Sequence, residues 1–209
     1  MKLSWIGHAS FRIDLDNGTS IVTDPFDPAV GYDMPVRAAD IVTMSHNHHD
    51  HNHIGALAPK HVLREAQSCA LCGARIEGYP AFHDDAAGSR RGGNVIFSIE
   101  ADGARIVHLG DLGHDLSDEQ ISRFGAVDVL LIPVGGVYTI DAGQAAALAR
   151  RIGARVTVPM HFRTEKLRFE LGAVEPFLEA MCQPCAHADA LDPREENAPV
   201  VVMPYGKGL

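Results

Sequence analysis

Five of the chain's 12 histidines lie between positions 46 and 53, in the run Ser-His-Asn-His-His-Asp-His-Asn-His that begins at Ser45. Inside this run, the pattern His-x-His-x-Asp-His is formed by His46, His48, Asp50 and His51. Imidazoles and carboxylates together are suitable ligands for zinc and similar divalent ions. Solvated loop histidines would not explain an aspartate interleaved at this spacing, so the pattern predicts a metal site.

The same spacing predicts two metal ions. In a tight loop, the alternate residues His46 and His48 can point to one side and bind one ion. Asp50 and His51 can then turn toward a second ion a few ångströms away. Each zinc needs about four to five ligands, so this loop cannot complete both coordination shells. Further donors are expected where three strand-like runs end, at His83, Asp111 and His161.

The elements that must position these donors are strands. Alternating apolar and polar residues from Leu3 to Leu15, a turn at residues 16–18 and a second run at Ile21 and Val22 predict an N-terminal β-hairpin. The ends of several strands meet at one edge in α/β folds, which is the usual place for an active site. Buried strands that stop at polar residues are predicted over 40–45, 105–110, 127–135 and 155–160.

Helices are predicted between these strands. Ser117 and Gln120 form a capping box for a helix that Gly125 ends, and Asp141 caps a helix that runs through residue 150 to a stop at Gly153. A third helix is predicted over 175–181 and a closing strand over 199–203. No linker or shift in composition divides the chain, so one α/β domain over residues 1–209 is expected.

Length and composition limit the class of protein. A chain of 209 residues, 46% hydrophobic and with net charge −9, can bury a core large enough to fold without a structural metal, so a bound metal is expected to be functional. No apolar run reaches membrane-spanning length, and the first residues lack a signal peptide, which predicts a cytoplasmic protein. The absence of basic runs argues against nucleic acid as a partner and favours a small-molecule substrate.

The ordered series His-x-His-x-Asp-His, His, Gly-Asp and His resembles the metallo-β-lactamase superfamily of metal-dependent hydrolases over nearly the whole chain. The small branch of that superfamily related to ascorbate-6-phosphate lactonases is similar in further segments, at residues 6–11, 23–25, 132–136 and 159–162. The resemblance implies the metallo-β-lactamase fold, an αββα sandwich in which two mixed β-sheets lie between outer helices.

The resemblance also implies a ligand set. It assigns one ion to His46, His48 and His83 and the other to Asp50, His51 and His161, with Asp111 bridging both. Two divalent ions are implied, zinc being the expected metal and manganese or iron(II) the alternatives. Asp84 and Asp85 stand beside His83 as rival ligands.

His8 and Asp24 match positions typical of the lactonase-related branch. Histidines that bind metals usually donate their other ring N–H to a carboxylate or carbonyl, so Asp24 is a natural partner for one of them. The alternative is that Asp24 only forms the turn before Pro25 and that His8 is a core histidine. The sequence leaves both interpretations open.

The expected chemistry is hydrolysis of a small ester, lactone or phosphodiester. Two divalent cations can hold a bridging hydroxide at neutral pH and polarise the group under attack, and Asp50 could orient that hydroxide and pass its proton to the leaving group. Arg90 and Arg91 could clamp a phosphate or carboxylate on the substrate. Other basic residues near the expected site are Arg163, Lys166 and Arg168. The alternative is that all five are solvated loop charges.

A redox function is the main competing hypothesis. A mononuclear non-haem iron dioxygenase, or another redox enzyme on the same scaffold, would use similar histidine and aspartate ligands. Di-iron electron-transfer relatives tend to have Glu where this chain has His48, which disfavours that branch. A metal-binding protein without turnover is a third hypothesis, and the retention of every expected ligand argues against it.

Four cysteines form two Cys-x-x-Cys pairs, Cys69/Cys72 and Cys182/Cys185. Four thiolates could bind a structural zinc, but such pairs usually lie 15–20 residues apart along the chain. These pairs are separated by more than a hundred residues, so a shared zinc site requires two distant loops to meet. Ordinary reduced thiols are the favoured interpretation over a zinc site or a redox pair.

Overall fold

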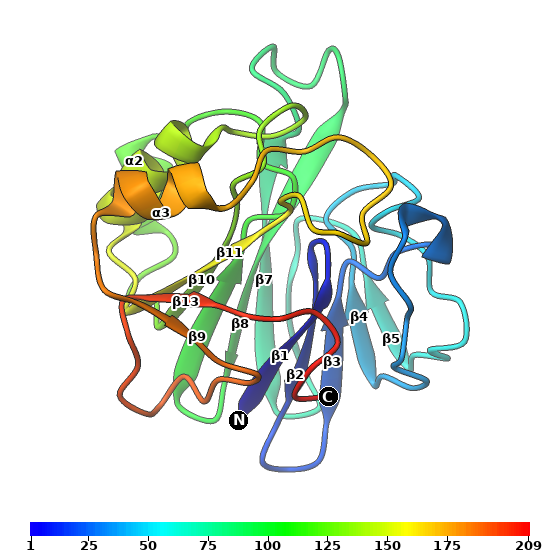
Figure 1. Cartoon of the computed structure of the whole chain (residues 1–209). Helices are drawn as coiled ribbons and strands as arrows, with labels where there is room; N and C mark the ends of the chain where they lie inside the picture. The colour runs from blue at the N-terminus through cyan, green and yellow to red at the C-terminus, as the bar shows by residue number, and fades with distance from the viewer.

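A computed structural model describes residues 1–209, and in it the strands form two mixed sheets that pack face to face (Figure 1). The smaller sheet is antiparallel from β1 to β3 and parallel from β3 to β5. Its strands, in spatial order, are β1 (Lys2–Gly7), β2 (Ser10–Asp14), β3 (Ser20–Thr23), β4 (Ile41–Thr43) and β5 (His61–Leu63).

The larger sheet has eight strands. Pairing is parallel from β12 through β13, β11 and β10 to β9, and antiparallel from β9 to β6. In spatial order the strands are β12 (Cys185–His187), β13 (Val200–Val202), β11 (Val156–Met160), β10 (Val129–Pro133), β9 (Ala104–His108), β8 (Gly93–Ala101), β7 (Ala74–Phe82) and β6 (Ser68–Leu71).

The strands predicted from apolar runs are all present, as β4, β9, β10 and β11, and the predicted closing strand is β13. Every residue of β10 and β11 is buried, as expected for parallel strands covered on both faces. The predicted hairpin is formed by β2 and β3, with Ile13 opposite Ile21, but its first arm, predicted from Leu3 to Leu15, is divided by a turn at residues 8–9 into β1 and β2. Strands β5 to β8 and β12 were not predicted. The residues of β5, β6, β7 and β12 are more polar or more exposed, whereas β8 is mostly buried and its apolar residues were overlooked.

Two of the three α-helices begin at predicted caps. Both predicted capping boxes are present, at Ser117 for α1 (Asp118–Ser122) and at Asp141 for α2 (Ala142–Ile152). Gly153 closes α2 in a left-handed conformation, whereas α1 ends at Ser122, before Gly125. The third helix, α3 (Glu175–Met181), has the predicted bounds. None of these helices is long and apolar enough to cross a membrane.

The predicted sandwich is confirmed, although its two outer layers differ. Helices α2 and α3 pack against each other, and α2 also contacts β10 of the larger sheet. The outer face of the smaller sheet is covered by loops and by the short 3-10 helix η1 (Pro28–Val30), seen at the right of Figure 1. Between the sheets lies the main apolar core, which includes Phe11 of β2 and Phe97 of β8. This core fixes the position of one sheet relative to the other.

Candidate metal centre

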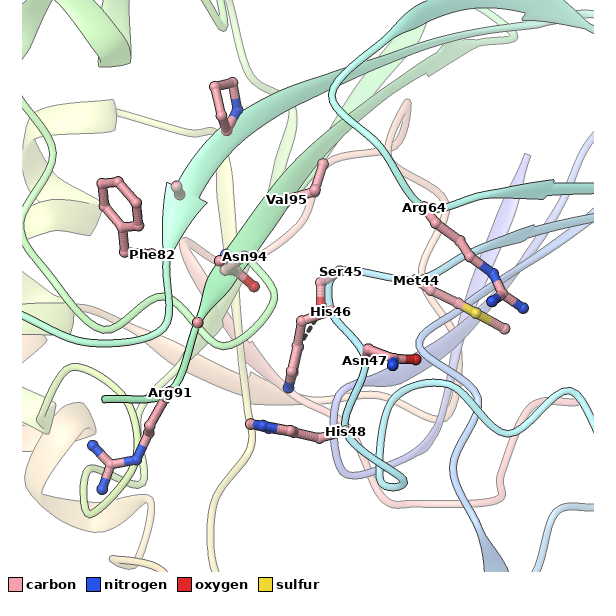
Figure 2. A pocket seen from close by; sticks show the side chains of 14 residues that line it. Met44, Ser45, His46, Asn47, His48, Arg64, Phe82, Arg91, Asn94 and Val95 are labelled. Atoms are coloured by element: carbon pink, nitrogen blue, oxygen red, sulfur yellow. Dashed lines mark hydrogen bonds between the residues drawn. The ribbon is translucent and has the colours of Figure 1, made fainter. Parts of the chain in front are cut away.

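The predicted metal ligands meet at one edge of the sandwich, where strands from both sheets end. One ligand atom from each of His46, His48 and His83 lies within 4.8 Å of the other two. We call these three residues the first group. His46 and His48 follow β4 of the smaller sheet, and His83 directly follows β7 of the larger sheet. In Figure 2 the rings of His46 and His48 lie close together, and their centres are 4.6 Å apart.

A second group forms beside the first. One ligand atom from each of His8, Asp50, His51 and His161 lies within 4.8 Å of the other three. His8 follows β1 and His161 follows β11, so this group also draws on both sheets. The structure therefore brings together the residues expected for the second ion and adds His8 to them.

Asp111 lies between the two groups. Its Oδ2 atom is 3.3 Å from Nε2 of His83 in the first group. The same oxygen is 3.3 Å from Nε2 of His51 and 3.1 Å from Nε2 of His161 in the second group. A carboxylate in contact with both groups has the placement that a bridging ligand requires.

Several buried polar atoms of these groups have no hydrogen-bond partner. They include Nε2 of His46, Nε2 of His51 and Oδ1 of Asp111. Leaving such atoms unsatisfied in the protein interior is costly, and imidazole nitrogens and carboxylate oxygens are the donors that zinc prefers. The residues present therefore fit divalent cations.

The pKa values of His46 and His83 suit metal binding. Burial and, to a smaller extent, the neighbouring His51 lower the pKa of His46 to about 3. Burial likewise lowers the pKa of His83. Both imidazoles are therefore neutral at pH 7 and offer a lone pair to a cation without losing a proton.

Asp24 connects His51 to the end of β4. Its carboxylate, fully buried, lies 2.8 Å from Nδ1 of His51 and accepts hydrogen bonds from the backbone N–H and the hydroxyl of Ser45. Nδ1 of His51 can therefore donate to Asp24, which leaves Nε2 facing Asp111. The Ser45 hydroxyl also contacts Nδ1 of His46 at 2.9 Å. Sequence reasoning missed Ser45, whose only signal is its position at a strand end.

His8 lies against Asp50. Its Nε2 atom is 3.1 Å from Oδ2 of Asp50, and its ring centre is 4.3 Å from that of His161. Burial lowers the pKa of His8 to about 4, so its ring is neutral at pH 7 and can donate from Nε2 to the carboxylate. His8 thus contacts two residues of the second group and is not an isolated core histidine.

Asp84 and Asp85, the alternative ligands beside His83, make other contacts. Asp84 is buried, and its two oxygens accept hydrogen bonds from the backbone N–H groups of Ala86, Gly88, Arg90 and Arg91. These hydrogen bonds outweigh the opposing effect of desolvation and lower the pKa of Asp84 to about 2. Asp85 points to solvent and pairs with Arg90 at 2.9 Å. Of the three neighbouring residues, His83 alone faces the site.

A cleft of about 540 Å³ opens above the two groups. Its walls include Arg91, Tyr138 and Phe169. The Arg91 guanidinium lies 5.4 Å from the centre of the Tyr138 ring, whereas the Arg90 side chain points away to Asp85. The two aromatic residues were missed by sequence reasoning. They belong to loops distant in sequence from the histidine run, and nothing in their local sequence marks them.

The other basic residues near His161 lie outside the cleft. Arg163, Lys166 and Arg168 are exposed, and none of them lines its walls. The two cysteine pairs are also remote from each other. Cys69 lies in β6 and Cys185 in β12, at opposite edges of the larger sheet, so the pairs do not form a shared zinc site.

A sandwich of two mixed sheets with histidine and aspartate groups at one edge defines the metallo-β-lactamase class of fold. The chain belongs to the β-lactamase superfamily, whose domain model matches residues 2–161, and within it to the UPF0173 family of metal-dependent hydrolases. A UPF0173 metal-dependent hydrolase from Methanoculleus marisnigri is 34% identical over 189 residues, which cover 78% of this chain and 82% of that protein.

Solved structures agree with this assignment. A protein from Thermotoga maritima, described as a Zn-dependent hydrolase of the metallo-β-lactamase superfamily, is 37% identical with a TM-score of 0.80, covering 97% of both chains. The diiron β-hydroxylase CmlA from Streptomyces venezuelae shares only the fold. It is 12% identical with a TM-score of 0.61, over 86% of this chain and 46% of that one.

Gly110 allows the chain before Asp111 to lie close to Asn94 and Ser45. Gly110, one residue before Asp111, has a φ of +56°. A Cβ atom at this position would lie 2.4 Å from Oδ1 of Asn94 and 2.5 Å from Cβ of Ser45. Asn94 in turn accepts a hydrogen bond from the backbone N–H of Asp111 at 3.0 Å. The position of Asp111 therefore depends on the missing side chain at Gly110.

We expect Gly110→Ala to destabilise the protein more than Gly103→Ala. Both glycines have positive φ, so both variants incur the same kind of backbone strain, but nothing lies within 4 Å of a Cβ at Gly103. The contacts at Gly110 should add about 1–3 kcal/mol to the loss in free energy of unfolding. Urea denaturation of metal-free protein measures the difference, and equal losses would show that this close approach is not needed.

Proposed function

We propose that the protein is a binuclear metal-dependent hydrolase that acts on a small ester, lactone or phosphodiester. The observation that carries this proposal is the pair of ligand groups with Asp111 between them. His46, His48 and His83 would hold one cation, Asp50, His51 and His161 the other, and Asp111 would contact both. Zinc is the expected metal, with manganese or iron(II) as alternatives. When bound, such cations lower the pKa of water toward neutrality and polarise the group under attack.

Asp50 is the residue proposed to move the proton. Burial raises its pKa, but contacts with His51 and His8 lower it more, so the net pKa lies well below its ordinary value. The carboxylate is therefore ionised at pH 7, and its lowered pKa makes it a weak base that would release a proton readily once it has taken one. Its contacts with His8 and His51 both use Oδ2. Because Asp50 borders the cleft, Oδ1 can take a proton from the attacking water and pass it to the leaving group.

Asp24 and His8 are proposed as positioning residues. Asp24 holds the His51 ring in the tautomer that keeps a lone pair on Nε2. His8 donates to Oδ2 of Asp50 and so limits the rotation of that carboxylate. Neither residue needs to touch the substrate in this proposal.

We expect protein purified without added metal to contain two zinc or manganese ions per chain, because the site offers two ligand groups. Elemental analysis gives this ratio. A panel of lactones, 4-nitrophenyl esters, bis(4-nitrophenyl) phosphate and thioesters then tests turnover. A chelator should abolish that turnover, and added zinc should restore it. One iron per chain would instead support the non-haem iron alternative and contradict the hydrolase proposal.

Asp50→Asn should lower kcat by about 10²- to 10⁴-fold, the usual contribution of a group that transfers a proton in the transition state. The amide keeps the shape of the side chain and one ligand oxygen but cannot accept the proton. Metal content at saturating zinc is measured alongside kcat to separate proton transfer from metal loss. Asp85→Asn serves as the control, since Asp85 is exposed and paired with Arg90. Full metal content with full turnover in Asp50→Asn would rule out the assigned role.

Asp24→Asn should weaken zinc binding by about 10- to 100-fold, because an amide can present its NH₂ group to His51 and favour the wrong tautomer. Competition with a chromophoric chelator measures the zinc Kd without reference to activity. Asp27→Asn is a matched control, since Asp27 lies 3.6 Å from His53, which is exposed and outside both groups. A zinc Kd equal to that of the unmodified protein would mean that the contact of Asp24 with His51 does not orient the ring for metal binding.

A further inference from the structure

A groove of about 660 Å³ opens beside the first group of histidines (Figure 2). Figure 2 shows His46 and His48 between Arg91 on one side and Arg64 on the other. The groove is bordered by the ends of β4, β5 and β7 and by the start of β8, so it lies between the two sheets. His48 and Arg91 line both this groove and the cleft, so the two cavities adjoin at these residues.

The groove is unusual for this protein in its charge. The chain carries 27 acidic residues and a net charge of −9, yet no Asp or Glu lines the groove. Arg64 and Arg91 both line it, and neither forms an ion pair, whereas the adjacent Arg90 is neutralised by Asp85. Arg64 is exposed, whereas Arg91 is half-buried, and an unpaired guanidinium in a concave, partly desolvated site attracts anions strongly.

The main chain holds Arg91 in place. The buried Asp84 carboxylate accepts a hydrogen bond of 2.7 Å from the Arg91 backbone N–H and three more from the same loop. The half-buried side chain meets only the Tyr138 ring and, at 3.5 Å, the Val137 carbonyl oxygen. The Arg91 side chain is thus positioned before any ligand binds, and the N–H groups of its guanidinium have no acidic partner.

We propose that this groove is a second arm of the substrate site and that Arg91, at its junction with the cleft, binds an oxyanion of the substrate. The substrate class is an ester that carries a carboxylate or phosphate group and is long enough to reach from the metal centre into the groove. The inference rests on the hydrolase function proposed above and adds the charge and the length of the substrate to it.

Turnover of a matched pair of esters by the zinc-loaded protein tests the role of Arg91. 4-Nitrophenyl butyrate is neutral, whereas mono(4-nitrophenyl) glutarate has the same leaving group and adds a carboxylate. We expect Arg91→Ala to lower kcat/KM for the glutarate ester by about 10- to 100-fold, mainly through KM, and to lower that for the butyrate ester far less. An equal effect on both esters would overturn the inference. The 4-nitrophenyl ester of 4-phosphonobutyrate distinguishes a phosphate-like oxyanion from a carboxylate.

Two further variants sharpen the test. Arg90→Ala is the matched control and should behave as the unmodified protein, because its side chain faces Asp85 outside both cavities. Gly93→Leu tests the groove itself, since Gly93 borders it and a Cβ there would meet only Ala81 O at 3.8 Å. The bulk of leucine should raise KM for the glutarate ester and spare 4-nitrophenyl acetate. Unchanged KM values for both esters would exclude the groove as a substrate arm.

Binding of free glutarate, measured by calorimetry on zinc-loaded protein, separates this inference from the hydrolase proposal. Arg91→Ala should weaken glutarate binding by about tenfold or more, whether or not any ester is hydrolysed. Arg91-dependent binding without turnover would support the anion site and contradict the hydrolytic chemistry. Turnover with glutarate binding that is unaffected by Arg91→Ala would leave the hydrolase standing and overturn the anion site.

Discussion

The buried carboxylate of Asp111 is the group on which the rest of the site depends. It is 2% exposed and lies within 3.3 Å of ring nitrogens of His51, His83 and His161, which come from three separate segments. Burial raises the pKa of Asp111, but His161 and His51 lower it more, so the group is ionised at pH 7. A buried anion without a positive partner costs several kcal/mol, so these segments must enclose a positive charge.

The raised pKa of His51 reflects the same need for a positive charge beside the buried carboxylates. Burial lowers the pKa of His51, but Asp111, Asp24 and Asp50 raise it more, so the pKa lies well above its ordinary value. A proton on His51 can therefore balance the carboxylates, and a divalent cation would do so more effectively because it also satisfies the unpartnered ring nitrogens. Proton and metal compete for the same electrostatic role, which is why metal affinity at such a site depends on pH.

The two sheets hold this arrangement against backbone strain. His8, Asp24 and His161 all have positive φ, between 39° and 54°, and such conformations cost of order 1–3 kcal/mol each at residues other than glycine. The strain is confined by backbone hydrogen bonds, since His161 N–H donates to the His8 carbonyl and Asp24 N–H to the Thr43 carbonyl. The first of these bonds joins the two sheets directly, so the apolar core between the sheets also fixes the geometry of the site.

Sequence reasoning succeeded where the signal is local. The histidine run lies within eight residues, the capping boxes span four, and the fully buried β10 and β11 have continuous apolar sequences. It failed for β7, whose Gly78 and Pro80 interrupt the pattern of a strand and whose pairing with β8 overrides that weak propensity. The aromatic side chains that line the cleft could not be predicted from the sequence for a related reason. Tyr138 and Phe169 approach the histidines only because loops after β10 and β11 fold back over the strand ends.

The distribution of charge connects the metal centre to the groove. The acidic surplus of the chain predicts repulsion of anions, yet the acidic groups near the site are engaged: Asp84 by backbone N–H groups and Asp85 by Arg90. The remaining carboxylates at the centre are Asp24, Asp50 and Asp111, and two divalent cations carry more positive charge than these three carry negative. A hydroxide held by the cations would offset that difference, so with neutral imidazoles the loaded centre would be close to neutral, and Arg91 would supply the positive potential along the wall shared by the cleft and the groove. An anionic substrate would then be attracted toward the reacting centre even though the net charge of the protein opposes its approach.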